Sequence, residues 1–318
     1  MLYPWQIDDY NNLVNAYLNR QFHSLILHGA VNSGREELIK QFIAYLLCHS
    51  PDHGFACGKC SSCIVHQQSN HPDLHVLCAD LSEERKTLII KVEQIRDASN
   101  FAMLSEHMSS RKVIYLPDAN QLNLNSANAL LKILEEPPLN CIFIMAATNL
   151  NRLLPTILSR CFKFQLKIPE YQQALEFLQQ QQTDNAEFWL NYYNGEPFFT
   201  EPVSNDQLNL LQQGLLKPSI DNIFALSSEL DPKKVGMSFW VDCLSKWIND
   251  LASCKLGGSA HFFASLNNDL TSLSKRLNSE KLFNFQDEIA FISEWAEHSL
   301  NHKLQLENLL FRYQQIYV

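Results

Sequence analysis

The chain has 318 residues, of which 46% are hydrophobic and 19% charged, a composition typical of an ordinary folded protein and not of a disordered one. The formal net charge is -9, with 14 basic and 15 acidic side chains in residues 1 to 166 against 11 and 19 in residues 167 to 318. Neither half has the basic excess that dominates binding to a nucleic-acid backbone, so we expect any DNA contact to be local or shared with partners.

Targeting signals and disulfides are not expected. The opening sequence lacks a basic segment followed by an apolar one, and no apolar run reaches the roughly 18 residues that a membrane helix needs. We therefore expect a cytoplasmic protein without membrane contact. The nine cysteines are an odd number, which argues against a disulfide framework in that compartment.

In the first half of the chain, short apolar runs alternate with helical patterns. Residues 23 to 29 predict a buried strand ending in a glycine turn, and residues 35 to 48 predict the helix that follows. A helix over 126 to 136 is predicted to be capped by Asn125 and stopped by two prolines. Further strands are predicted at 73 to 79, 112 to 117, 141 to 148 and 161 to 166. This alternation predicts an α/β domain with a parallel sheet covered by helices.

After Pro169 the strand signals disappear. Residues 170 to 197 predict two or three short helices, and from about Ser204 the pattern is helical to the end, with amphipathic stretches at 239 to 254, 282 to 300 and 302 to 318. We therefore predict three domains, namely an α/β domain over 1 to 166, a small helical domain over 167 to 204 and an all-α domain over 205 to 318.

A loop resembling a phosphate-binding loop follows the first strand of the α/β domain. Gly29 and Gly34 have the G-x4-G spacing between a predicted strand and a predicted helix. A nucleotide-hydrolysing loop continues with Lys and with Ser or Thr, whereas this chain has Arg35 and Glu36. The planar guanidinium of Arg35 does not replace the compact ammonium of a lysine in a tight loop. Glu36 would place a negative carboxylate where the phosphates should bind. We interpret the loop as a remnant of a nucleotide site, with a chance match or weak nucleotide binding as the alternatives.

The strand over 112 to 117 is where an acidic pair would be needed to handle Mg²⁺ and the attacking water. Its last residue is Pro117, and only Asp118 offers a carboxylate. The metal chemistry is therefore incomplete, independently of the loop. Asp118 is either a remnant of this second motif or a cap of the turn after the strand.

Four cysteines are spaced as metal ligands. Cys48, Cys57, Cys60 and Cys63 form C-x8-C-x2-C-x2-C, which gathers thiolates in one short insert. Thiolates suit tetrahedral Zn²⁺, and four protein ligands leave no open coordination position, so a structural zinc site is predicted at 48 to 63. Such an insert has too few apolar residues to fold by packing alone. Nearby histidines that compete as ligands are His49, His53 and His66.

Seven segments occur in an order that resembles the bacterial clamp-loader subunits of the AAA+ family. They are "HGAVNSGR", the four-cysteine insert, "HPDLHVL", "KVIYLPDAN", "NALLKILEEPP", "AATN" and "LLPTILSRC". The triplet at 159 to 161 matches the family's S-R-C motif. The resemblance covers residues 1 to 166 by motif and the rest only by layout.

The resemblance implies a member of the DNA polymerase III clamp loader that does not hydrolyse ATP. Hydrolysing members keep Lys-Thr or Lys-Ser in the loop, Asp-Glu in the second motif and an arginine in a second sensor. This chain has Arg35-Glu36, Pro117-Asp118 and, at the sensor position, Phe198. Spacing alone gives Arg160 no role, but the S-R-C motif implies an arginine finger supplied in trans to a neighbouring ATP site.

The implied partners are the tau/gamma motor subunits and the delta subunit in a hetero-pentamer, with the sliding clamp and primed DNA reached through the assembly. The last domain would then be the oligomerising collar. Two alternatives stay open, an active P-loop clamp-loader ATPase and a zinc-dependent nucleic-acid-binding protein. Lys59 is the only Lys or Arg in residues 48 to 66, which weighs against the second.

Overall fold

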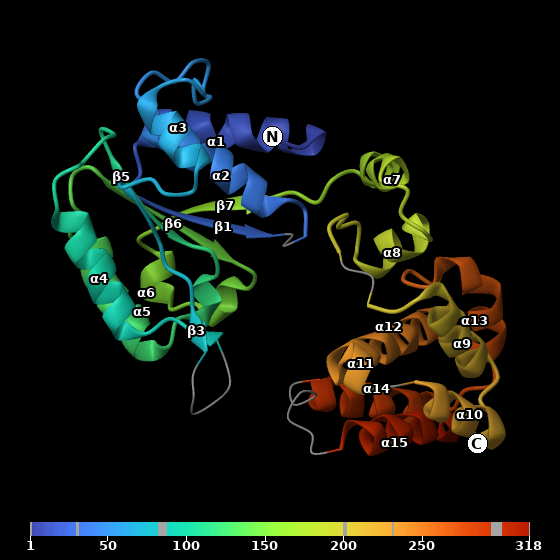
Figure 1. Cartoon of the computed structure of the whole chain (residues 1–318). Coiled ribbons are helices and arrows are strands. Elements are labelled where there is room, and N and C mark those ends of the chain that lie inside the picture. Colours follow the sequence, from blue (N-terminus) through green and yellow to red (C-terminus); the bar gives the residue numbers. More distant parts are fainter. Residues whose placement is uncertain are drawn as a thin grey trace. The chain divides into compact units, whose positions relative to one another are not determined.

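The computed structural model describes residues 2–29, 32–81, 88–199, 202–230, 232–293 and 301–317. The chain divides into two compact units, Met1–Glu170 and Tyr171–Val318, which we describe one at a time (Figure 1). This boundary lies close to the one predicted at 166, while the predicted separation of residues 167 to 204 from 205 to 318 remains a prediction. No helix in the described part of the chain is long and apolar enough to span a bilayer.

The first unit is built on a five-stranded sheet in the order β2-β5-β6-β1-β7, with all neighbouring strands parallel. Its strands are β1 (Ser24–Gly29), β2 (Leu74–Val76), β5 (Lys112–Leu116), β6 (Cys141–Ala147) and β7 (Phe162–Leu166). All five predicted strands and their parallel arrangement are confirmed. Every residue of β6 is buried, as expected for a central strand with both faces covered.

Helices cover both faces of this sheet (Figure 1). On one face the core is formed with α1 and α2, and on the other with α4, α5 and α6, while α3 packs against α2. The helices are α1 (Ile7–Arg20), α2 (Arg35–Leu47), α3 (Ser61–Gln67), α4 (Val92–Met103), α5 (Leu124–Glu135) and α6 (Pro155–Leu158). Short 3-10 turns are η1 (Pro4–Gln6), η2 (Ala119–Gln121) and η3 (Leu150–Arg152). The sequence patterns did not predict the two-residue strands β3 (Asp80–Leu81) and β4 (Leu88–Ile89), which pair antiparallel with each other.

The predicted cap of α5 was wrong by two residues. Asn123, not Asn125, is the N-cap, because its backbone is extended and its side chain accepts a hydrogen bond from the Ser126 N–H at 2.9 Å. Asn125 already lies inside the first turn, where a side-chain cap cannot form.

The elements of the second unit are all helices in the part that the structure describes. Its helices are α7 (Tyr171–Gln180), α8 (Ala186–Tyr192), α9 (Asn205–Leu216), α10 (Ile220–Glu229), α11 (Pro232–Val235), α12 (Met237–Lys255), α13 (Asn267–Ser274), α14 (Ser279–Ser293) and α15 (His302–Gln315), with a 3-10 turn η4 (Ala264–Leu266). The end of the helix predicted over 282 to 300 lies outside the described residues from 294 onward. One face of α8 packs with α7 in a small cluster, while Trp189 and Tyr192 of the same helix join the larger core of the later helices.

A buried carboxylate fixes the loop that leads into β5. Asp73 is fully buried and accepts hydrogen bonds from the backbone N–H groups of His107, Met108 and Ser109, each at 2.8 Å, and from the Ser109 hydroxyl at 3.1 Å. Burial alone would raise the pKa of this carboxyl, but the N–H donors hold it below its ordinary value of 3.8. The ionised form is therefore the one that the fold stabilises.

We expect Asp73→Asn to lower the free energy of unfolding by about 1.5 to 3 kcal/mol near neutral pH, because an amide cannot accept all these bonds and adds donors of its own. Urea unfolding checks this, with Asp97→Asn on the exposed face of α4 as the matched control. The folded pKa is depressed, so the contribution of Asp73 is present above the unfolded pKa and is lost as the pH falls through the folded value. A wild-type advantage that grows on acidification would contradict this account.

Candidate functional site

Both glycines of the phosphate-loop motif are required by the surrounding packing. Gly29 has φ +115°, and a Cβ there would lie 2.5 Å from the carbonyl oxygen of Leu166 on β7. Gly34 has φ +85°, and a Cβ there would come within 2.8 Å of the Tyr3 ring. These are backbone conformations and approaches that only glycine allows without strain. The G-x4-G spacing is thus explained by the fold, without a nucleotide.

The segment before α1 packs directly on the turn that opens α2. The Trp5 Nε1–H donates to the Ser33 carbonyl oxygen at 3.0 Å, and the Gln6 amide donates to the Gly34 carbonyl oxygen at 2.7 Å. Gln6 is only 3% exposed, and its bond to Gly34 is partly buried. The side chains of a neighbouring segment therefore hold the described part of the loop in place.

The two residues that replace the usual Lys and Ser or Thr are engaged with neighbouring strands. Arg35 is 5% exposed, and its Nη1 donates to the carbonyl oxygen of Ala147 at the end of β6 at 3.3 Å. The Glu36 carboxylate accepts a hydrogen bond from the Tyr115 hydroxyl on β5 at 2.7 Å. Burial and the Glu36 charge raise the pKa of Tyr115 well above its usual range, so this hydroxyl stays a donor. Both side chains therefore already have bonding partners within the protein.

Asp118 caps a turn in this structure. Its Oδ1 accepts from the Asn120 N–H at 3.0 Å at the start of η2. Asn120 in turn accepts from the N–H groups of Thr148 at 2.8 Å and Asn149 at 3.1 Å, and its amide donates to the Asn149 carbonyl oxygen at 2.7 Å. The sequence left two interpretations open for Asp118, and the structure contains the contact expected of a turn cap. The ends of β5 and β6 are bonded to each other through Asn120.

Phe198, which stands where a second sensor arginine would be expected, makes an apolar contact in the second unit. Its ring packs edge-on against Phe177 of α7, with ring centroids 5.4 Å apart. An aromatic ring in this position offers no charge to a phosphate.

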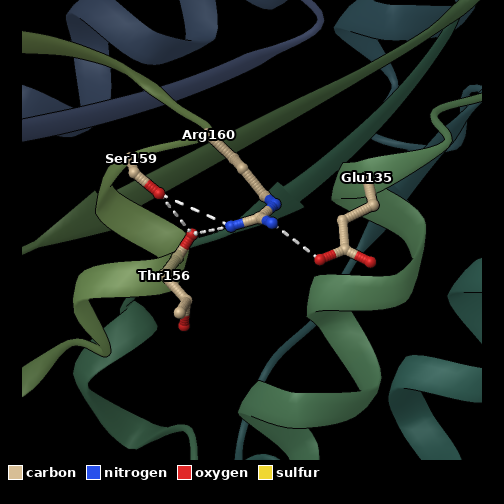
Figure 2. Close-up of polar contacts among 4 residues, drawn as sticks. All are labelled: Glu135, Thr156, Ser159 and Arg160. Carbon is tan, nitrogen blue, oxygen red and sulfur yellow. Dashed lines mark hydrogen bonds and ion pairs between the residues drawn. The ribbon is translucent and has the colours of Figure 1, made fainter.

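Arg160 lies between α6 and β7, and its side chain points toward Glu135 of α5 (Figure 2). Its carbonyl oxygen accepts from the Ser24 hydroxyl on β1 at 2.7 Å, which anchors the backbone. The guanidinium Nη2 pairs with a Glu135 carboxylate oxygen at 2.7 Å, and Nη1 donates to the Thr156 carbonyl oxygen at 3.0 Å. The side chain nevertheless stays 35% exposed. The Arg160 guanidinium is therefore oriented by Glu135 and Thr156 and is still accessible from solvent.

The four cysteines of the insert converge with the geometry of a metal site. The sulfur atoms of Cys48, Cys57, Cys60 and Cys63 all lie within 4.8 Å of one another, and those of Cys57 and Cys63 are 4.0 Å apart. Four thiolates about 2.3 Å from a tetrahedral Zn²⁺ would lie about 3.8 Å apart, so the donor set fits. Hydrogen bonds from the N–H groups of Lys59 and Cys60 lower the pKa of Cys57 to about 6, whereas burial raises the pKa of Cys48 and of Cys63.

The competing histidines are not part of this cluster in the described residues. The His49 Nε2 lies 2.7 Å from the Met108 carbonyl oxygen, on the loop that Asp73 fixes. His53 is exposed and lies 3.6 Å from the Asp52 carboxylate. The cysteines alone make up the candidate metal site.

A parallel sheet covered by helices, with a glycine loop between β1 and α2, is the fold of P-loop proteins. In this chain, the side chains of Trp5 and Gln6 bond to the described part of that loop. The model of the family described as "DNA polymerase III, delta subunit" matches residues 6–170. The chain therefore belongs to this DNA polymerase III family, and several of its curated relatives are delta-prime subunits.

Two of these relatives are DNA polymerase III subunit delta-prime of Pseudomonas aeruginosa, 35% identical over 56% of this chain and 52% of the relative, and that of Escherichia coli, 35% identical over 57% and 53%. The matched part spans about half the length of these relatives. Among solved structures, a DNA polymerase III gamma subunit-related protein of Thermotoga maritima is 18% identical with a TM-score of 0.46, over 98% of this chain and 100% of that one.

Two contacts of the site had not been predicted from the sequence. One is the packing of Tyr3, Trp5 and Gln6 on the loop, for which the only signal is an aromatic, proline-containing segment ahead of α1. The other is the ion pair between Glu135 and Arg160, whose partners are separated by 25 positions. Both depend on the tertiary fold.

We expect the purified chain not to bind MgATP. At about 100 times the dissociation constant of a working site, a ligand would add about 2.7 kcal/mol to the free energy of unfolding. Urea unfolding with and without MgATP should therefore give equal midpoints. The double variant Arg35→Lys, Glu36→Thr restores the Lys-Thr sequence of the motif, but the Trp5 and Gln6 contacts remain. Its urea midpoint should therefore also be unchanged by MgATP. A saturable stabilisation of either protein would contradict this account.

Proposed function

We propose that this chain is a non-hydrolysing delta-prime subunit of the AAA+ DNA polymerase III clamp loader, and that Arg160 is an arginine finger for the ATP site of a neighbouring subunit. Support comes from the family, from the contacts at its own loop and from the accessible Arg160 guanidinium. The chain would serve as a scaffold while the sliding clamp is loaded onto primed DNA.

The positions of Arg160 and the loop on the sheet carry the proposal. Arg160 bonds to Ser24 at the first residue of β1, whereas the loop starts at Gly29, the last. A six-residue strand spans roughly 17 to 20 Å, which exceeds the reach of one side chain. The Arg160 side chain therefore cannot reach a phosphate bound at the loop of its own chain. A nucleotide phosphate that it contacts would be bound to another subunit.

The chemistry of such a finger depends on free N–H donors. A guanidinium has five N–H bonds in a planar fork. Arg160 uses one on Nη1 to bond Thr156 and one on Nη2 to pair with Glu135, which leaves donors for a phosphoryl group. Fingers of this kind contribute about 10³ to 10⁵ in rate, or about 4 to 7 kcal/mol of transition-state stabilisation.

The partners that we propose are the tau/gamma motor subunits and the delta subunit in a cytoplasmic hetero-pentamer, with the clamp and DNA reached through the assembly. The helices from α9 onward would form the collar. The net charge of -9 supports the view that this chain is not itself the main DNA-binding surface.

We expect Arg160→Ala to leave assembly of the reconstituted loader intact and to lower the rate at the ATP site that it completes by about 10³ or more. The DNA-stimulated ATP hydrolysis rate of the whole loader should fall by the fraction that this one site contributes. Steady-state hydrolysis and size-exclusion chromatography measure both effects.

The control is Arg152→Ala, which removes an exposed arginine from the nearby η3 turn. This variant should hydrolyse ATP like the wild type. Loaders with Arg160→Ala that assemble and keep full ATPase activity would refute the finger.

We also propose that the four-cysteine insert holds one structural zinc ion. All four positions of a tetrahedral ion would be taken by thiolates, so no site is left for a reacting water. The ion would tie the end of α2, through Cys48, to the start of α3, through Cys60 and Cys63. Zinc would thereby stabilise a segment whose own packing is small.

We expect about one zinc per wild-type chain and much less in Cys57→Ser, with a lower free energy of unfolding, because three ligands hold the metal less tightly. Metal analysis and urea unfolding of the same samples check this. Cys78→Ser, at an exposed cysteine outside the cluster, is the control and should retain zinc. Wild-type protein that takes up no stoichiometric zinc would contradict the proposal.

A further inference from the structure

The Arg160 guanidinium is held from two sides by groups on different elements (Figure 2). Nη2 pairs with Glu135 at the end of α5 at 2.7 Å, and Nη1 donates to the Thr156 carbonyl oxygen in α6 at 3.0 Å. The Ser159 hydroxyl is 3.5 Å from Nη1, which is too long to fix the fork. Orientation of the fork therefore depends on Glu135 and Thr156.

We infer that Glu135 is a positioning residue for Arg160, an inference that rests on the proposed finger. Glu135 receives one N–H of the fork and leaves Nε and the remaining N–H bonds available to a phosphoryl group. An arginine side chain has about 2 kcal/mol of rotamer entropy, part of which is lost when it binds. A carboxylate that already restricts the side chain removes part of this loss before the neighbouring subunit arrives.

The carboxylate at position 135 is not explained by the helix that carries it. Glu135 is the last residue of α5, where unpaired carbonyl groups make the helix end partially negative and a basic side chain is favoured. Glu136 follows it directly, adding a second negative charge. Lys132 is the basic residue of this last turn, and the pair with Arg160 brings a second cation to the helix end.

The core fixes the position of both partners. Ile133 and Leu134, in the last turn of α5, are 6% and 2% exposed, and Ile157 of α6 is fully buried in the same hydrophobic cluster. The Ser24 hydroxyl anchors the Arg160 carbonyl oxygen. The positions of the end of α5 and of the Arg160 backbone are thus set by packing that does not involve the ion pair.

Stability does not account for the pair, because it is largely exposed. The side chains of Arg160 and Glu135 are 35% and 51% exposed, and such pairs add little to folding. Loss of Glu135 should therefore leave the unfolding midpoint unchanged. A misplaced catalytic group, by contrast, can lower a rate by up to 10²-fold. A change in rate without a change in stability separates positioning from a structural role.

The test is a double-mutant cycle in the complete reconstituted loader, with Glu135→Ala, Arg160→Ala and the double variant. We expect Glu135→Ala to lower the maximal ATP hydrolysis rate at the site that Arg160 completes by about 10-fold, with the KM for ATP unchanged. The double variant should be no slower than Arg160→Ala. Glu135→Gln keeps an acceptor oxygen and should recover part of the rate, while the control Glu136→Ala should match the wild type.

A Glu135→Ala loader as fast as or faster than the wild type would overturn the inference. So would a further loss of rate when Glu135→Ala is added to Arg160→Ala, because Glu135 would then act independently of the arginine. Failure of the proposed function looks different, since it would appear as full activity of the Arg160→Ala loader.

Discussion

The pairing of β1 between β6 and β7 is the constraint on which both parts of the site depend. At the carboxyl end of β1, Gly29 lies so close to Leu166 of β7 that no side chain fits there. At the amino end, the Ser24 hydroxyl holds the Arg160 backbone. One buried strand therefore fixes the loop at one edge of the sheet and the arginine at the other. This separation puts the loop of the same chain out of reach of the Arg160 side chain.

The contacts of the loop agree with the proposal that this chain does not hydrolyse ATP. Gly29 and Gly34 are required by the backbone and its packing, whatever the loop binds. Arg35 and Glu36 now bond to the ends of neighbouring strands, and Asp118 caps a turn. These contacts weigh against an active ATPase. Lys59 remains the only Lys or Arg in residues 48 to 66, which does not favour nucleic-acid binding by the insert.

Apolar runs bounded by turns were enough to predict the five sheet strands, and cysteine spacing was enough to predict the cluster. Local rules were less reliable where two side chains competed for one role, so Asn125 was predicted as the α5 cap that Asn123 supplies. The two-residue strands β3 and β4 are too short to leave a pattern. The pair of Glu135 with Arg160 joins distant positions, and only the packed core brings them together.

The central claim of the proposed function is that Arg160 acts on the reacting phosphate of another subunit. The most direct measurement is the affinity of the assembled loader for MgADP with aluminium fluoride, a mimic of the transferring phosphoryl group, with Arg160 and with Arg160→Lys. An arginine finger is needed mainly in the transition state, so the account predicts much weaker binding of the mimic to the variant and equal binding of MgADP alone. Equal affinity of both loaders for the mimic at every site would contradict it.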